Sequence, residues 1–177
     1  MKNWLGWIAA TLAVAVVVHV ASVMFLPRAI MLRTMGGIVR GAHGANHMVF
    51  GARPTAANRG VVRPSPDLLY SSCVYNLQRG GGAVRVRASG MPRTYWSVSV
   101  FDADTNNIFV ENDRKAGDHV DFLIVAPGFG QGSGLPTVES PTRAGIVLFR
   151  TLIDDDKRLP ELDAARRHAS CEAYRAD

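Results

Sequence analysis

The stretch Tyr95-Trp-Ser-Val-Ser-Val-Phe101 decides the fold class of this chain. Large apolar side chains alternate with serines along it, which is the period of two of a β-strand that buries one face. We expect Trp96, Val98 and Val100 to face a hydrophobic core and the two serines between them to face outward. The stretch therefore predicts a half-buried strand, around which the other elements can be arranged.

Further strands are predicted on both sides of this stretch. Residues 83–88 alternate valine with arginine, residues 122–126 form a short apolar run between turn residues, and residues 145–153 are the longest strand candidate. Strands spaced by about 10–15 residues, without helical periodicity between them, indicate an antiparallel β-sandwich or barrel-like domain. Residues 159–174 are rich in Ala, Arg and Glu, and Pro160 lies near a plausible first helical turn, so we expect a C-terminal helix packed on the sheet.

The N-terminal region has the composition of a membrane anchor. Residues 4–26 form a run of 23 residues without Asp, Glu, Lys or Arg. As a helix this run is about 34 Å long, enough to cross a hydrocarbon core. It is longer than the apolar core of a signal peptide, and no clean small-residue cleavage site follows. We therefore expect one uncleaved transmembrane helix that precedes the mainly β domain.

Basic charge is concentrated beside this anchor. No Asp or Glu precedes Asp67, whereas seven basic residues do, and the rest of the chain carries 13 Lys or Arg against 15 Asp or Glu. A uniformly basic domain would suggest nucleic acid, whereas a basic segment beside an apolar helix suggests anionic lipid head groups. Membrane lipid is therefore the predicted contact, and no nucleic-acid partner is expected. We divide the chain into a membrane anchor (1–27), a juxtamembrane basic linker (28–62) and a mainly β domain (63–177).

Two cysteines leave two interpretations open. Cys73 and Cys171 are the only cysteines and lie far apart in the sequence. They could form one disulfide, which would imply an oxidising compartment, or remain as two buried free thiols. There is no C-x-x-C motif and no Cys/His cluster, so neither a redox motif nor a zinc site is supported, and no cofactor is predicted.

Polar and aromatic residues near the predicted strand ends form a candidate binding set. These are Asp67, Tyr70, Tyr95, Trp96, Asp102, Asp104 and Arg143. They could line a ligand cleft, or they could hold the corners of the sheet through buried hydrogen bonds. No spacing identifies a nucleophile with its base, so catalytic residues are not assigned. Residues 102–107 have the spacing that begins a calcium loop, but Asn107 stands where that loop needs glycine, so we predict a turn and no metal site.

Several of these segments together resemble the family called domain of unknown function 1254. They are Arg63–Ser71, Arg93–Asn106, Phe122–Gly128 and Ser140–Arg143, followed by a hydrophobic strand and a terminal helix, within residues 46–174. Asp67 and Tyr70 match a D-T-x-Y-S element of the family, in which Leu68 here replaces the threonine and Pro66 the usual asparagine.

The resemblance implies a mainly β fold without an assigned biochemical role. Relatives are commonly exported, which favours a domain on the periplasmic side of the bacterial inner membrane. Charge alone points the other way, because three arginines follow the anchor and one lysine precedes it. Longer members carry a second β domain, called domain of unknown function 1214, and this chain ends before such a domain could begin.

Two functions are therefore expected. The first is a non-enzymatic, membrane-anchored envelope protein, an interaction module that pairs with a separately encoded β domain of the 1214 type. The second is a small-molecule-binding or hydrolytic enzyme domain with a cleft at the strand ends, near Tyr70, Trp96, Asp102 and Arg143. A concave pocket that joins these side chains would favour the second, and a flat apolar face or an open sheet edge would favour the first.

Overall fold

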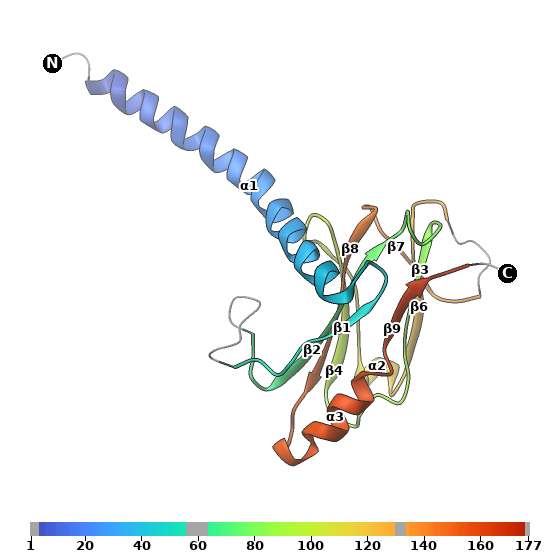
Figure 1. The fold of residues 1–177 in the computed structure, drawn as a ribbon. Coiled ribbons are helices and arrows are strands. Elements are labelled where there is room, and N and C mark those ends of the chain that lie inside the picture. Colours follow the sequence, from blue (N-terminus) through green and yellow to red (C-terminus); the bar gives the residue numbers. More distant parts are fainter. Residues whose placement is uncertain (1–3, 56–63, 130–133, 176–177) are drawn as a thin grey trace.

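Two β-sheets face each other as the layers of a sandwich, and one long helix projects from it (Figure 1). The structure is a computed structural model that describes residues 4–55, 64–129 and 134–175. Sheet A contains, in spatial order, β1 (Met48–Phe50), β2 (Leu68–Asn76), β8 (Ala144–Leu152), β4 (Trp96–Asp102) and β5 (Asn107–Asn112). Sheet B contains β7 (Thr137–Glu139), β6 (Val120–Val125), β3 (Ala83–Ala88) and β9 (Ser170–Ala173). All described neighbours are antiparallel except β6 and β7, so the predicted antiparallel sandwich is confirmed.

The alternation that predicted the strands is the alternation that builds the core. In β4, Trp96, Val98 and Val100 are fully buried between the sheets, while the two serines between them belong to the outer face of sheet A. In β3, Val84 and Val86 enter the same core, and the arginines next to them point outward. Each of these strands therefore contributes one apolar face to the space between the layers.

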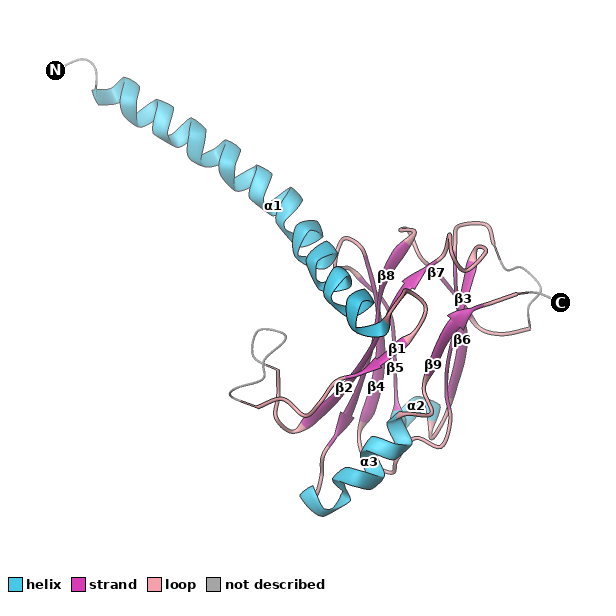
Figure 2. Cartoon of the chain, viewed as in Figure 1, coloured by secondary structure: helices cyan, strands magenta, loops and turns pink. Residues whose placement is uncertain are grey.

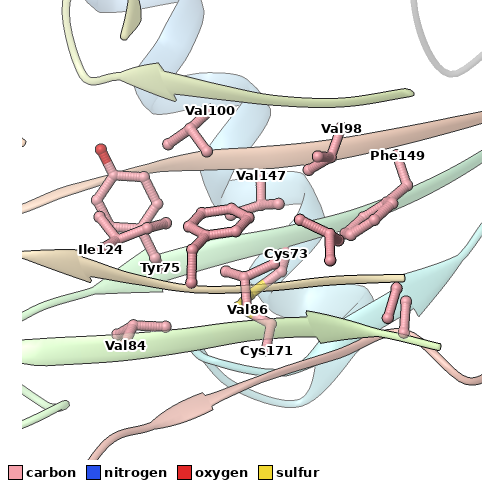
Figure 3. Packing of buried hydrophobic residues seen from close by; sticks show 14 of the residues in the cluster. Cys73, Tyr75, Val84, Val86, Val98, Val100, Ile124, Val147, Phe149 and Cys171 are labelled. Atoms are coloured by element: carbon pink, nitrogen blue, oxygen red, sulfur yellow. A yellow bond between two sulfur atoms is a disulfide. The ribbon is translucent and has the colours of Figure 1, made fainter. Parts of the chain in front are cut away.

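A disulfide crosses this core. Cys73 on β2 and Cys171 on β9 are bonded to each other, with their Cα atoms 6.5 Å apart, among Val86, Val147 and other apolar side chains (Figure 3). Of the two interpretations of the cysteines, the structure has the disulfide. Because β2 belongs to sheet A and β9 to sheet B, this bond ties the two layers together covalently.

Helix α1 (Trp4–Ala42) is a single helix of 39 residues that contains Pro27. Its apolar first part is long enough to cross a membrane by length and composition, as predicted for the anchor. Its last turns lie on the outer face of sheet A, where Met31 and Met35 pack against Val74 and Ile146. The expected linker 28–62 therefore includes the docked end of α1 and strand β1, and its residues 56–62 lie outside the described part of the chain.

The predicted C-terminal helix is present but shorter than expected. Helix α3 (Leu159–Arg166) follows a 3₁₀ turn, η1 (Asp156–Arg158), and lies with the short helix α2 (Asp113–Ala116) at one end of the sandwich (Figure 2). Residues 170–173, which we expected to be helical, form β9 instead. Their local composition favours a helix, but pairing with β3 and the bond from Cys171 to Cys73 override it.

One buried arginine fastens α3 to the edge of sheet A. The Arg166 guanidinium donates to the carbonyl oxygens of Tyr70 (2.7 Å) and Gly51 (2.8 Å), and it pairs with Asp163 on its own helix. Leu162, one turn earlier, is fully buried against Leu69. A charge this deep is stable only because both backbone acceptors and a carboxylate satisfy it.

Candidate functional site

The structure divides the predicted binding residues between opposite ends of sheet A. Trp96 begins β4 and Asp102 ends it, so these two residues are separated by about 20 Å along the strand. Tyr70 and Tyr95 lie near the Trp96 end. Tyr70 is near the start of β2, and the Tyr95 carbonyl accepts a bond from Leu152 N at the end of β8. In the described part of the chain, the predicted binding residues at these two ends therefore do not share one cleft.

Three members of the set at the Asp102 end hold a turn and its surroundings. The buried carboxylate of Asp102 accepts bonds from Asp104 N (2.9 Å), Asn106 N (2.8 Å) and Asn106 Nδ2 (2.8 Å). Asp104 is exposed and pairs with Arg28 of α1 at 3.0 Å, while Arg143 is exposed in the turn before β8. Asp102 therefore closes the β4–β5 turn, as predicted for this motif.

A buried tyrosine stabilises the same end. Tyr75 Oη lies 2.8 Å from Ser140 Oγ and donates to the Phe101 carbonyl at 3.3 Å. Burial raises the pKa of Tyr75, against the opposing effect of its bonds to Ser140 and Thr142, so the phenol stays neutral. Gly145 lies directly against Tyr75 Oη and the Phe101 carbonyl, where no Cβ would fit. This network holds β2, β4 and β8 together, and its neutral phenol makes no general base.

Trp96 is a structural residue as well. Its indole is completely buried in the core, and its Nε1 donates to the Gly117 carbonyl at 3.1 Å, just after α2. This bond satisfies the one polar atom of the side chain, as expected for a buried tryptophan. The indole is therefore not available to a ligand.

The half of sheet A near Tyr70 and Tyr95 has an outer face with a different character, in which Tyr95 is exposed, Tyr70 and Arg150 are half-buried, and two serines are buried. In the strand register, Tyr70 of β2 and Ser97 of β4 both pair with Arg150 of β8. The Arg150 guanidinium donates from Nη2 to Ser99 Oγ at 3.3 Å. We call this surface the Arg150 face and define it by Tyr70, Tyr95, Ser97, Ser99 and Arg150.

The hydrogen bonding of the Arg150 face is incomplete. Ser97 Oγ and Arg150 Nε are buried, yet neither has a hydrogen-bond partner among the described residues. Arg150 makes no ion pair with any described residue. By contrast, Arg85 on the outer face of sheet B binds Asp121 through two hydrogen bonds of 2.8 and 2.6 Å. The Arg85 guanidinium lowers the pKa of Asp121, chiefly through these hydrogen bonds. Among the described residues, Arg85 of sheet B therefore has an acidic partner, whereas Arg150 of sheet A forms no ion pair.

The chemistry of the Arg150 face suits recognition of an anion. A guanidinium offers several N–H donors in one plane and binds carboxylates or phosphates through paired hydrogen bonds. Tyr70 Oη accepts a bond from Ser65 N at 3.0 Å and can also donate its own proton, and Tyr95, on the other side of β8, is 42% exposed. Across the described ranges, no group of three or more His, Cys, Asp or Glu side chains could hold a metal ion.

Sequence reasoning found the two tyrosines of this face and missed its arginine. Arg150 lies within the longest predicted strand, where Val147 and Phe149 enter the core. The available signal was a charged residue in the middle of an otherwise apolar strand, which later proves to be a central strand of sheet A. Such a residue on a sheet face that is expected to be covered indicates either an internal ion pair or a binding role.

Comparisons with known proteins agree with this architecture. None of the curated proteins compared with the chain matches it in sequence. The crystal structure of the VPA0106 protein from Vibrio parahaemolyticus is similar, with a TM-score of 0.62 and 12% identity over 88% of this chain and 38% of that chain. An uncharacterised protein from Burkholderia cenocepacia gives a TM-score of 0.49 and 15% identity over 87% of this chain and 42% of that chain.

At this identity the Vibrio structure supports the fold alone, and the present chain spans less than half the length of either solved chain. The sequence comparison reaches further. The profile of the family described as proteins of unknown function, DUF1254, matches residues 45–173, which include every strand of the sandwich. The chain therefore belongs to the DUF1254 family, as the motifs in its sequence indicated.

Proposed function

We propose that this protein is a single-pass, membrane-anchored module of the bacterial cell envelope that binds a second protein domain and is not an enzyme. Helix α1 supports the anchor, because it is long and apolar enough to cross a bilayer. The Cys73–Cys171 disulfide supports a periplasmic domain, because such bonds persist in oxidising compartments. The inner membrane with the domain outside the cytoplasm satisfies both conditions.

The observation that carries the binding role is the uncompensated cation on the Arg150 face. Arg150 is half-buried on the outer face of sheet A, and its guanidinium has no carboxylate partner among the described residues. A partner that supplies an acidic side chain would satisfy it. Tyr95, 42% exposed, and Val110, 57% exposed on β5, add aromatic and apolar area at its border. Tyrosine and arginine are the residue types that carry much of the binding energy at protein interfaces.

The partner we propose is a β domain of the type called domain of unknown function 1214, encoded separately. Longer relatives carry such a domain after the first, as the resemblance implies. The size of the Vibrio chain supports this, since the sandwich corresponds to only 38% of it. In a two-domain arrangement, one face of the first domain contacts the second, and the Arg150 face is a surface suited to that contact.

The experiment is purification of the full-length, tagged protein from membranes with mild detergent, compared between wild type and two variants. Arg150→Glu reverses the charge of the Arg150 face, and Arg87→Glu is the matched control on the outer face of sheet B. We expect a protein with a 1214-type β domain, identified by mass spectrometry, to accompany the wild type and the control and to be lost with Arg150→Glu. Retention of that protein by Arg150→Glu, or its absence from the wild type, would contradict the proposal.

A small anionic ligand is the second candidate for the same face. It is favoured by the combination of Arg150 with two tyrosines, which could bind one carboxylate without a protein partner. Titration of the purified protein with a series of small carboxylates would reveal it as saturable heat of binding that Arg150→Glu abolishes. Binding of this kind without a co-purified protein would favour the second candidate over the first.

A further inference from the structure

We infer that the turn between β4 and β5, residues 103–106, is a membrane-contacting surface that lies in the head-group layer of the bilayer and binds phospholipid together with α1. The inference rests on the proposed anchor and goes beyond it, because an anchor alone leaves the domain free to stand away from the membrane. It is carried by the continuity of α1, by the contacts of the turn with α1, and by the charge of the turn.

The continuity of α1 leaves no flexible tether. The run without charged residues ends at Leu26, and Met31 is already buried against sheet A. At 1.5 Å per residue, these two positions are only about 7.5 Å apart along the helix axis. Since the helix is unbroken from Trp4 to Ala42, the sandwich begins almost where the apolar span ends. The domain is therefore held close to the surface that the helix enters (Figure 1).

The β4–β5 turn reaches back along the helix toward the span. Ala103 packs in the same cluster as Met31 and Met35, and Asp104 Oδ1 lies 3.0 Å from Arg28 Nη1. The next residue, Thr105, lines a hollow of about 480 Å³ together with Ser22, Val23, Leu26, Pro27 and Ile30 of α1. Ser22 lies four residues before the end of the uncharged run, about 6 Å inside it. Thr105 is therefore level with helix residues that the bilayer must cover.

The charge of the turn is compatible with this position. A carboxylate is costly near lipid unless it is paired or fully hydrogen-bonded. Asp102 is 1% exposed and accepts three hydrogen bonds within the turn, and Asp104 is neutralised by Arg28. The remaining residues of the turn, Ala103, Thr105 and Asn106, are uncharged. The turn therefore presents no unpaired anion to the phosphates of the head groups.

The occupant of the hollow follows from its lining. Val23, Leu26, Pro27 and Ile30 give it an apolar wall that is continuous with the lipid-exposed surface of the span. Arg28 follows Pro27 of this wall in the sequence and pairs with Asp104, which precedes Thr105, and Arg33 and Arg40 are exposed further along α1, beyond the apolar span. An acyl chain against the wall and a phosphate near Arg28 match this order of apolar and basic groups. The partner is accordingly a phospholipid of the surrounding bilayer.

The test uses single-cysteine labelling of the full-length protein in vesicles of phosphatidylcholine and phosphatidylglycerol. The two native cysteines are bonded to each other, so an introduced cysteine is the only reactive thiol. Thr105→Cys carries an environment-sensitive fluorophore, and Arg93→Cys, near the opposite end of β4, is the matched control. Leu12→Cys, within the span, reports the anchor itself. Quenchers attached to the lipid at shallow and deep positions are compared with aqueous iodide.

We expect the Thr105 label to be quenched several-fold more strongly by the shallow lipid quencher than the Arg93 label, and to be protected from iodide. Asn107→Cys, one residue beyond the turn, should give the same result if the label itself does not disturb Thr105. A Thr105 label that behaves like the Arg93 label, while the Leu12 label is quenched deeply, would overturn the inference and leave the anchor intact. A Leu12 label that iodide reaches would overturn the anchor and this inference together.

Discussion

The outer face of sheet A has two halves that the same strands build differently. In the half near the β4–β5 turn, β8 presents Ile146 and β2 presents Val74, and helix α1 covers both. Four residues further along β8, about 13 Å away, the same face presents the half-buried Arg150 beside two buried serines, Ser97 and Ser99. The covered half thus provides stability, and the polar half around Arg150 contains polar groups without a partner among the described residues. In one sheet, an apolar face indicates an internal contact, and a polar face without partners indicates an external one.

The largest expected effect concerns the covalent frame that both halves share. The double variant Cys73→Ala with Cys171→Ala removes a cross-link between residues 98 positions apart. The chain-entropy estimate for a loop of this length is a loss of about 4–5 kcal/mol in the free energy of unfolding. Urea-induced unfolding of the full-length protein in detergent, followed by near-ultraviolet circular dichroism, measures it. A loss below about 1 kcal/mol would show that packing alone holds the sheets together.

The next effect tests the covered half. Ile146→Ala removes apolar volume between sheet A and α1, and we expect it to lower the free energy of unfolding by about 2–4 kcal/mol. Val110→Ala is the matched control, because Val110 is 57% exposed on the same sheet and should cost less than about 0.5 kcal/mol. Equal effects of the two variants in urea unfolding would contradict the packing of α1 on this half. Faster amide exchange around Met35 in the first variant would support it.

In the polar half around Arg150, a substitution should affect binding and leave the free energy of unfolding almost unchanged. Arg150→Met keeps the apolar length of the side chain and removes a cation that has no acidic partner among the described residues. We expect its free energy of unfolding to remain within about 1 kcal/mol of the wild type, while the binding of an anionic partner is lost. Destabilisation as large as that of Ile146→Ala would mean that Arg150 has a structural role, and the distinction between the halves would fail.

The smallest effect compares this unpaired arginine with the paired one on sheet B. Hydrogen bonds from Arg85 lower the pKa of Asp121 below its ordinary value of 3.8. The stabilisation from this pair is therefore complete above that value and is lost as the pH falls through the lower pKa of the folded state. Since both side chains are partly exposed, it amounts to less than about 1 kcal/mol. Urea midpoints of the wild type and Asp121→Asn should differ at pH 6 and converge in acid. A difference that grows in acid would reverse the sign of this assignment.

The strands could be predicted from the sequence because each half-buried strand repeats one simple pattern. The run from Tyr95 to Phe101 shows this best, since every inward position that it predicted is buried. The strand is not half-buried as we expected, because Ser97 and Ser99 on its outer face are buried as well. The long apolar helix at the N-terminus was equally readable, because its length and composition alone indicate it. The family followed from motifs spread over the same region, and the profile match over residues 45–173 confirms it.

Other features depended on contacts between segments that are distant in sequence. Residues 170–173 have helical composition, but they complete sheet B through β3 and the disulfide. The candidate site was only partly predictable for the same reason. Tyr70 and Tyr95 share an end of sheet A because β8 lies between β2 and β4, and this strand order places Arg150 between them. Asp102 and Arg143 resemble site residues in the sequence, yet they belong to the opposite end of the strands.

The disulfide has a mechanical consequence for a domain fixed at one end. Tension applied between α1 and β9 passes through β1 and along β2 to Cys73, and it crosses directly to Cys171. The residues between these cysteines, which form most of both sheets, lie in a closed loop that carries no load. Strand β1 and the beginning of β2 can be detached from the sheet by a pulling force. The roughly 330 Å of chain between the two cysteines cannot be extended, because the disulfide closes it into a loop. A pull on α1 would thus act on the first two strands and leave the loop that contains Arg150 folded.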